Sequence, residues 1–140
     1  VGAPANPEDV AYERMLHGRA AALVAAGKIR FLPPVTHDKT PHLYNTHRLY
    51  VNATPTGSFD KTILEAMACG AFVFTANCSF KDAVSPDGFF QENGNNLAAR
   101  LEVALLLKPE ERQKTAVLLR QQVITSHGLE LLAKTVIASY

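Results

Sequence analysis

One stretch decides the fold of this 140-residue chain: Ala71-Phe72-Val73-Phe74-Thr75. It is apolar at almost every position, whereas a strand with one solvated face alternates apolar and polar residues. A continuous apolar run of this length predicts a strand that is covered on both faces, as in a parallel sheet. Gly70 precedes it, and we expect this glycine to close a compact helix over Thr62 to Cys69. Helices are therefore expected on both sides of the sheet.

Strand and helix patterns alternate outward from this stretch. Before it we expect a helix from about Pro7 to Ala26 that Gly27 ends, a strand at Ile29–Leu32, a short helix at Pro41–Asn45 and a strand at Leu49–Asn52. After it we expect a short piece at Phe80–Val84, a turn at Pro86-Asp87-Gly88, a small edge strand at Phe89–Phe90, and helices at about Asn96–Leu107, Pro109–Thr125 and Leu129–Ser139. This alternation predicts an α/β fold, namely one domain over residues 1–140 with a Rossmann-like open parallel sheet and helices on both faces.

Composition excludes several classes of protein. Hydrophobic residues make up 47% and charged residues 19% of the chain, which is too apolar for a disordered segment. A net charge of +1 gives no general attraction for nucleic acid or an anionic membrane. Two cysteines are too few for a disulfide framework or a zinc site, which favours a reducing cytoplasm. We expect no metal, because His37, His42 and His47 recur every five residues and do not share one helix face.

The loop before the predicted helix at 62–69 is the candidate site, because open parallel sheets bind ligands beyond the carboxyl ends of their strands. At about 100° per residue, Ser58, Lys61 and Glu65 fall in one sector of a helix. Glu65 is the only charged residue between Ile63 and Gly70, and a buried carboxylate needs hydrogen-bond donors. Two interpretations remain open: Glu65 pairs with Lys61 on a solvated face, or it accepts hydrogen bonds from a diol such as a ribose.

The string Leu64-Glu65-Ala66-Met67-Ala68-Cys69-Gly70-Ala71-Phe72-Val73 resembles the signature of the retaining, nucleotide-sugar-dependent glycosyltransferases of GT-B architecture (group-1 type). The C-terminal domain of that family carries a Glu-x7-Glu motif. Further similarity extends over nearly the whole chain, at Ile29–Val35, Leu49–Pro55, Ala83–Phe90 and Asn96–Arg120. The resemblance implies the C-terminal half of a GT-B fold.

The resemblance also implies roles for individual residues. Glu65 matches the second motif glutamate, which contacts the ribose hydroxyls of the donor in that family. The first motif glutamate would fall eight residues earlier, where this chain has Gly57. The residues implied at the donor phosphate or sugar are Gly57, Ser58, Phe59, Asp60 and Lys61, and those implied at the nucleotide base are Leu32, Pro33 and Pro34. Two alternatives stay open, since Ser58 could simply cap the helix and the Pro33-Pro34 pair could simply end a strand.

The resemblance implies a transferase that uses a nucleotide-sugar donor as substrate and needs no metal or other cofactor. Val1 to Pro4 read like the tail of a strand, so we expect a domain that is truncated on its N-terminal side and inactive by itself. Its expected partner is an N-terminal, acceptor-binding domain of the same parent chain, with no nucleic acid bound and no transmembrane segment. We expect a cytoplasmic location, with contact to a membrane surface only through the parent protein. The alternative is a GT-B-like binding or scaffold module without turnover, which Gly57 in the motif favours.

Overall fold

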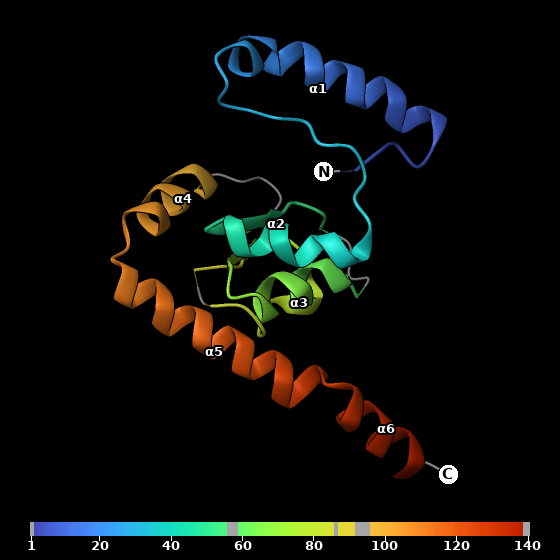
Figure 1. The fold of residues 1–140 in the computed structure, drawn as a ribbon, viewed down its shortest axis with the longest axis vertical. Coiled ribbons are helices and arrows are strands. Elements are labelled where there is room, and N and C mark those ends of the chain that lie inside the picture. The colour runs from blue at the N-terminus through green and yellow to red at the C-terminus, as the bar shows by residue number, and fades with distance from the viewer. Residues whose placement is uncertain (1, 56–58, 86, 92–95, 139–140) are drawn as a thin grey trace. The chain divides into compact units, whose positions relative to one another are not determined.

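The computed structural model describes residues 2–55, 59–85, 87–91 and 96–138. The chain forms two compact units, Val1–Thr40 and Pro41–Tyr140. The first holds helix α1 (Pro7–Ala25) and the 3-10 turn η1 (His37–Lys39), and helix α2 (Thr40–Thr46) begins where it ends. The second holds the two strands and the remaining helices (Figure 1). The single domain expected over residues 1–140 stays a prediction.

In the first unit, α1 confirms the predicted helix to within a residue. The backbone N–H of Asn6, its N-cap, donates to Asp9 Oδ2 at 3.1 Å, and Gly27 follows the helix with φ 69°. The predicted strand at Ile29–Leu32 is wrong, because these residues join no sheet in the described part of the chain. One backbone hydrogen bond, from Gly2 N to Leu32 O at 3.1 Å, ties the segment to the start of the chain. A single bond does not make the ladder that defines a strand.

The second unit is built around a parallel pair of strands, both within a residue of where the sequence predicts them. Strand β1 (Leu49–Asn52) pairs with β2 (Phe72–Thr75) so that Leu49 lies opposite Phe72 and Asn52 lies opposite Thr75. On the other side of β2, an isolated parallel bridge joins Thr75 to Phe89. The strand therefore has a partner at both edges, as predicted for a central strand.

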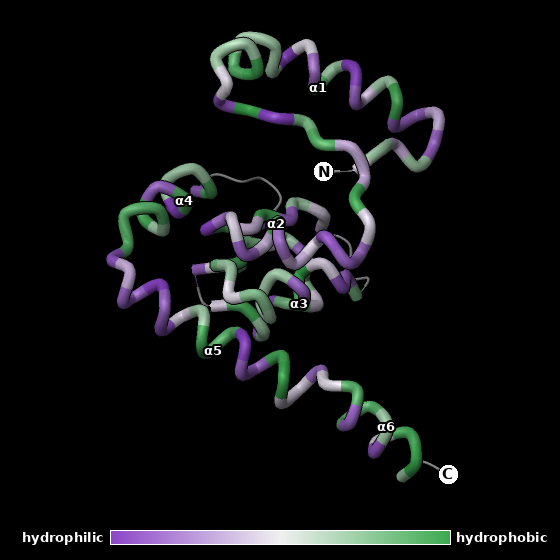
Figure 2. The backbone as a smooth tube through the Cα atoms, viewed as in Figure 1, coloured by the Kyte–Doolittle hydropathy of each residue, from purple (hydrophilic) through white to green (hydrophobic). Residues whose placement is uncertain are grey.

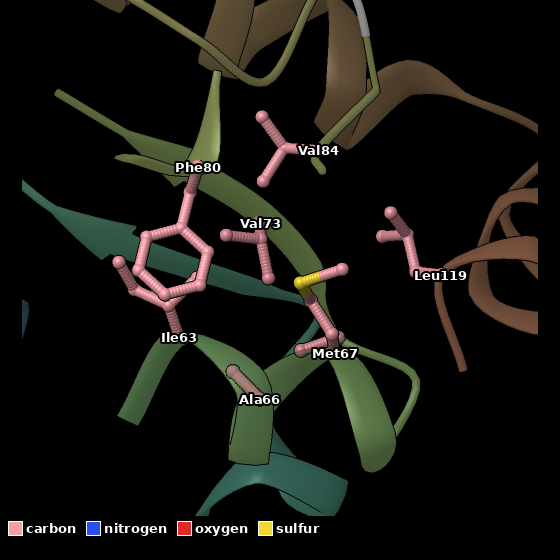
Figure 3. Packing of buried hydrophobic residues seen from close by; sticks show 8 residues of the cluster. Ile63, Ala66, Met67, Val73, Phe80, Val84 and Leu119 are labelled. Atoms are coloured by element: carbon pink, nitrogen blue, oxygen red, sulfur yellow. The ribbon is translucent and has the colours of Figure 1, made fainter. Parts of the chain in front are cut away.

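Helices cover both faces of β2, and all four of its residues are buried. Val73 points toward α3 (Lys61–Ala68) and α5 (Pro109–His127), where it packs in a cluster with Ile63, Met67, Phe80 and Leu119 (Figure 3). Phe72 and Phe74 belong to a second cluster, with Ala104 of α4 (Leu97–Leu106). The predicted α/β class with helices on both faces of a parallel sheet is confirmed.

The remaining helices also fall near their expected positions, since η2 (Cys78–Phe80), α5 and α6 (Leu129–Ala138) lie within the predicted segments or close to them. The C-terminal end of α3 is tied to α5, because Arg120 Nη1 donates to the carbonyl oxygen of Ala68 at 2.8 Å. None of the described residues of helix α6 is buried, although its tube is largely apolar in Figure 2.

Gly88 gives a direct test of the packing around β2. Its N–H bonds to Ser85 O at 2.7 Å and its carbonyl accepts from Thr75 N at 2.7 Å. A Cβ atom at this position would collide with the carbonyl oxygen of Val73 in β2. We predict that Gly88→Ala lowers the free energy of unfolding by about 1–3 kcal/mol, the usual cost of overpacking, measured as the shift in urea midpoint.

The matched control is Asp87→Ala, because Asp87 is exposed and stands next to Gly88 in the same turn. Its effect should stay within about 0.5 kcal/mol, as for most surface substitutions. Equal midpoints for the two variants would contradict the close approach of this turn to β2.

Candidate functional site

The candidate site lies where β1 and β2 end and α3 begins. At the end of β1, Asn52 Nδ2 donates to Asp60 Oδ2 at 2.8 Å, and Asn52 Oδ1 accepts from Thr54 N at 3.2 Å. Across the pair, Thr75 Oγ1 donates to Asn52 Oδ1 at 3.5 Å. The carboxyl ends of both strands are thus tied through Asn52 to the residue that precedes α3.

Asp60 is the N-cap of α3. Its Oδ1 accepts hydrogen bonds from Thr62 N at 2.9 Å and from Thr62 Oγ1 at 2.7 Å, so it satisfies a backbone donor of the first turn. The sequence interpretation that Ser58 caps this helix is therefore corrected, because α3 begins at Lys61 and its cap position falls on Asp60. Gly57 and Ser58 themselves lie outside the described residues, and their predicted contacts stay predictions.

Glu65 is half-buried on α3 and contacts Tyr44 of α2. Tyr44 Oη donates a hydrogen bond to Glu65 Oε2 at 3.2 Å, and the two helices lie beside each other in Figure 1. One turn earlier on α3, the hydroxyl of Thr62 bonds to the hydroxyl of Tyr50 from β1. The two tyrosine rings meet edge to face, with centroids 5.7 Å apart. Sequence reasoning did not single out either tyrosine, since nothing local links them to residues 12 or 21 positions away.

The tyrosine hydroxyls are protonated donors at neutral pH. Burial raises the pKa of Tyr44 well above its ordinary value, and the nearby Glu65 carboxylate raises it further. Burial also raises the pKa of Tyr50, although the hydrogen bonds from Thr62 and Asn52 oppose this shift. The hydrogen bond to Glu65 is therefore one from a neutral phenol to a carboxylate.

Two further predicted site residues flank the cap. Lys61 is the first residue of α3 and is exposed to solvent. Phe59 is also exposed, and its ring lies 5.3 Å from the ring of Phe80 and 5.6 Å from that of His127, centroid to centroid. The Phe59 ring thus packs against the buried Phe80 and against His127, and these contacts account for an aromatic residue here without a ligand.

The three residues predicted at the nucleotide base, Leu32, Pro33 and Pro34, belong to the first unit. Leu32 and Pro33 line an open cavity of about 640 Å³ together with residues 2–5 and one side of α1. At this cavity the ring of Phe31 stacks on His17, with centroids 3.8 Å apart. The structure therefore gives Leu32 and Pro33 a concave surface within their own unit.

A larger cavity of the second unit, about 850 Å³, lies elsewhere. It is bounded by β2, α4 and α5, and its lining includes Phe72, Phe74 and Arg100 but none of the predicted site residues. Ser85 Oγ, which is buried and has no hydrogen-bond partner among the residues that the structure describes, also belongs to this lining. The guanidinium of Arg100 donates to the carbonyls of Asp87 and Phe89, so this side chain braces the 87–89 turn.

Within the described residues, no group of three or more His, Cys, Asp or Glu side chains is arranged to hold a metal ion. Among the helices of the same residues, none combines the length and apolar character that a bilayer span requires.

Residues 7–138 match the model of a family described as glycosyl transferase-like. The chain belongs to this glycosyltransferase family. It is also 38% identical over 87 residues to a D-inositol 3-phosphate glycosyltransferase from Salinispora tropica, an alignment that covers 57% of this chain and 18% of that protein. The chain thus spans a minor part of its relative's length, and no solved structure gives a significant match.

In this glycosyltransferase-family domain, helix α3, which carries the first part of the string on which the resemblance rested, has two separate faces. Ile63, Ala66 and Met67 are fully buried in the core, while Glu65 turns toward Tyr44 (Figure 3 shows the core side). The helical period accounts for this division. The same short helix therefore anchors the sheet and presents a carboxylate.

The cap of α3 yields a prediction for the stability of this domain. We expect Asp60→Ala to lower the free energy of unfolding by about 0.5–2 kcal/mol, because it leaves the Thr62 N–H without its acceptor. Asp60→Ser is the matched control, since serine retains a capping oxygen and should recover most of this loss. The measurement is the urea midpoint of each variant, and equal midpoints for alanine and serine would show that the capping oxygen contributes nothing.

Proposed function

We propose that this glycosyltransferase domain binds the donor, a nucleotide-diphosphate sugar, along α3, with Glu65 accepting hydrogen bonds from the ribose hydroxyls. The observation that carries the proposal is the setting of Glu65. Its carboxylate is half-buried on the helix that starts at the carboxyl edge of the sheet, and a neutral phenol donates to it. The phenol of Tyr44 carries no charge, so this hydrogen bond does not itself neutralise the Glu65 carboxylate.

We place the diphosphate of the donor at the N-terminus of α3. Helix N-termini attract anions, because their first N–H groups lack intrahelical partners and the helix dipole is positive there. The Asp60 carboxylate already accepts from Thr62 N at the cap, but no acidic residue occupies the first turn of α3 itself. The exposed Lys61 adds a positive charge at its first position. Both carboxylate oxygens of Asp60 accept hydrogen bonds, one from Asn52 and the other from Thr62. We therefore assign Asp60 a structural role, in which it ties the end of β1 to the start of α3.

The reaction that we propose for the parent protein is transfer of a hexose with retention of anomeric configuration. The leaving diphosphate would be stabilised by helix N–H groups and basic side chains, an electrostatic contribution that is often the largest in such catalysis. The acceptor would be held by an N-terminal domain. The Salinispora relative, named for transfer to an inositol phosphate, agrees with a sugar-transfer role.

The test is Glu65→Ala in the intact protein, with donor affinity measured by calorimetry for UDP-glucose, GDP-mannose and ADP-glucose in turn. We expect the donor that binds wild type to bind the variant about tenfold to a hundredfold more weakly, because hydrogen bonds to a charged group contribute about 1.5–3 kcal/mol. Glu102→Ala removes an exposed carboxylate from α4 and should leave donor affinity unchanged.

The urea midpoint of the same variant separates donor binding from a structural role. A half-buried glutamate that serves the ligand should cost little stability when removed, whereas a buried ion-pair partner should cost about 3 kcal/mol or more. Unchanged donor affinity with a large fall in midpoint would refute the proposal. Failure of all three nucleotide sugars to bind wild-type protein would favour a binding or scaffold module instead.

A further inference from the structure

We infer that Tyr44 is a positioning residue that holds the Glu65 carboxylate in the orientation that receives the donor ribose. This inference rests on the function proposed for Glu65 and adds a residue that the sequence motif does not contain. The contact joins α2 to α3 across 21 residues, with Tyr44 Oη 3.2 Å from Glu65 Oε2.

The direction of this hydrogen bond is fixed by chemistry. A carboxylate has no proton to give, so the phenol must donate. Partial burial of Tyr44 and the charge of Glu65 both raise the pKa of the phenol, which keeps its proton in place at neutral pH. The oxygen of Glu65 that faces α2 is thus held by a permanent donor.

Tyr44 is itself held in place, which a positioning residue requires. Its ring meets that of Tyr50 edge to face, and both rings pack against the buried cluster that contains Ile63 and Met67. The hydroxyl of Tyr50 bonds to Thr62, one turn before Glu65 on the same helix. The two tyrosines therefore contact α3 at consecutive turns, so that the position of Tyr44 follows that of the helix.

The hydrogen bond from Tyr44 lowers the conformational entropy that Glu65 loses when the donor binds. A glutamate side chain rotates about three bonds, and fixing it at the moment of binding costs conformational entropy. A hydrogen bond that is already formed in the free protein removes part of that cost, so the carboxylate is preorganised for its ligand. The donor is neutral, and it therefore restrains Glu65 without cancelling the charge that attracts the ribose hydroxyls.

The test is a double-mutant cycle on the intact protein, with Tyr44→Phe, Glu65→Ala and the combined variant. Phenylalanine keeps the ring against Tyr50 and removes only the hydroxyl. We expect Tyr44→Phe to weaken binding of the responsive nucleotide sugar by about threefold to tenfold, the effect of one modest hydrogen bond. In the Glu65→Ala background the same change should have no further effect, because the hydroxyl then has no carboxylate to hold.

Tyr50→Phe is the matched control, since it removes a hydroxyl from the neighbouring ring that bonds to Thr62 rather than to Glu65. Its effect on donor affinity should be the same with and without Glu65. If Glu65→Ala weakens donor binding and Tyr44→Phe does not, or if their effects simply add, the role of Tyr44 is refuted and the proposed function stands. If Glu65→Ala itself leaves donor binding unchanged, the proposed function fails and the role of Tyr44 fails with it.

Discussion

The burial of β2 is the constraint on which the second unit depends. Every residue of this strand is buried, so its backbone N–H and C=O groups need partners inside the protein. β1 supplies them along one edge, and the turn around Gly88 supplies them at Thr75 on the other. The side chains in turn require apolar cover on both faces, which α3 and α5 provide for Val73 and α4 provides for Phe74. The burial of this four-residue strand therefore determines where α3, α4 and α5 pack.

The candidate site is a by-product of that arrangement. α3 must lie on the face of Val73 to bury Ile63 and Met67, and the chain reaches it directly from the end of β1. The N-terminus of α3, which Asp60 caps, consequently lies at the ends of the strands. The face that carries Glu65 lies beside α2, where Tyr44 donates to Glu65. A helix with an apolar and a polar face at the carboxyl edge of a parallel sheet is the usual setting for a ligand in such folds.

Sequence reasoning succeeded where the signal was local. The apolar run at 71–75 and the glycines at 27 and 70, both with positive φ, fixed a strand and two helix ends. It failed at Ile29–Leu32, because a short segment becomes a strand only where another strand can pair with it, and the composition of the segment does not reveal that partner. The sequence also offered Ser58 as a cap that the structure assigns to Asp60, because the boundaries of a helix are uncertain by one or two residues. Tyr44 could not be found at all, because its significance arises only when α2 and α3 come together.

The bond between Arg120 and Ala68 has a consequence for motion. α3 has eight residues, too few to persist as an isolated helix in water, yet it is capped by Asp60 at one end and bound to α5 by Arg120 at the other. Its amide protons should therefore exchange with solvent only when the core opens as a whole, and not by fraying from either end. The helix that carries Glu65 then behaves as a part of the most protected unit of the protein, although its outer side is open to a ligand.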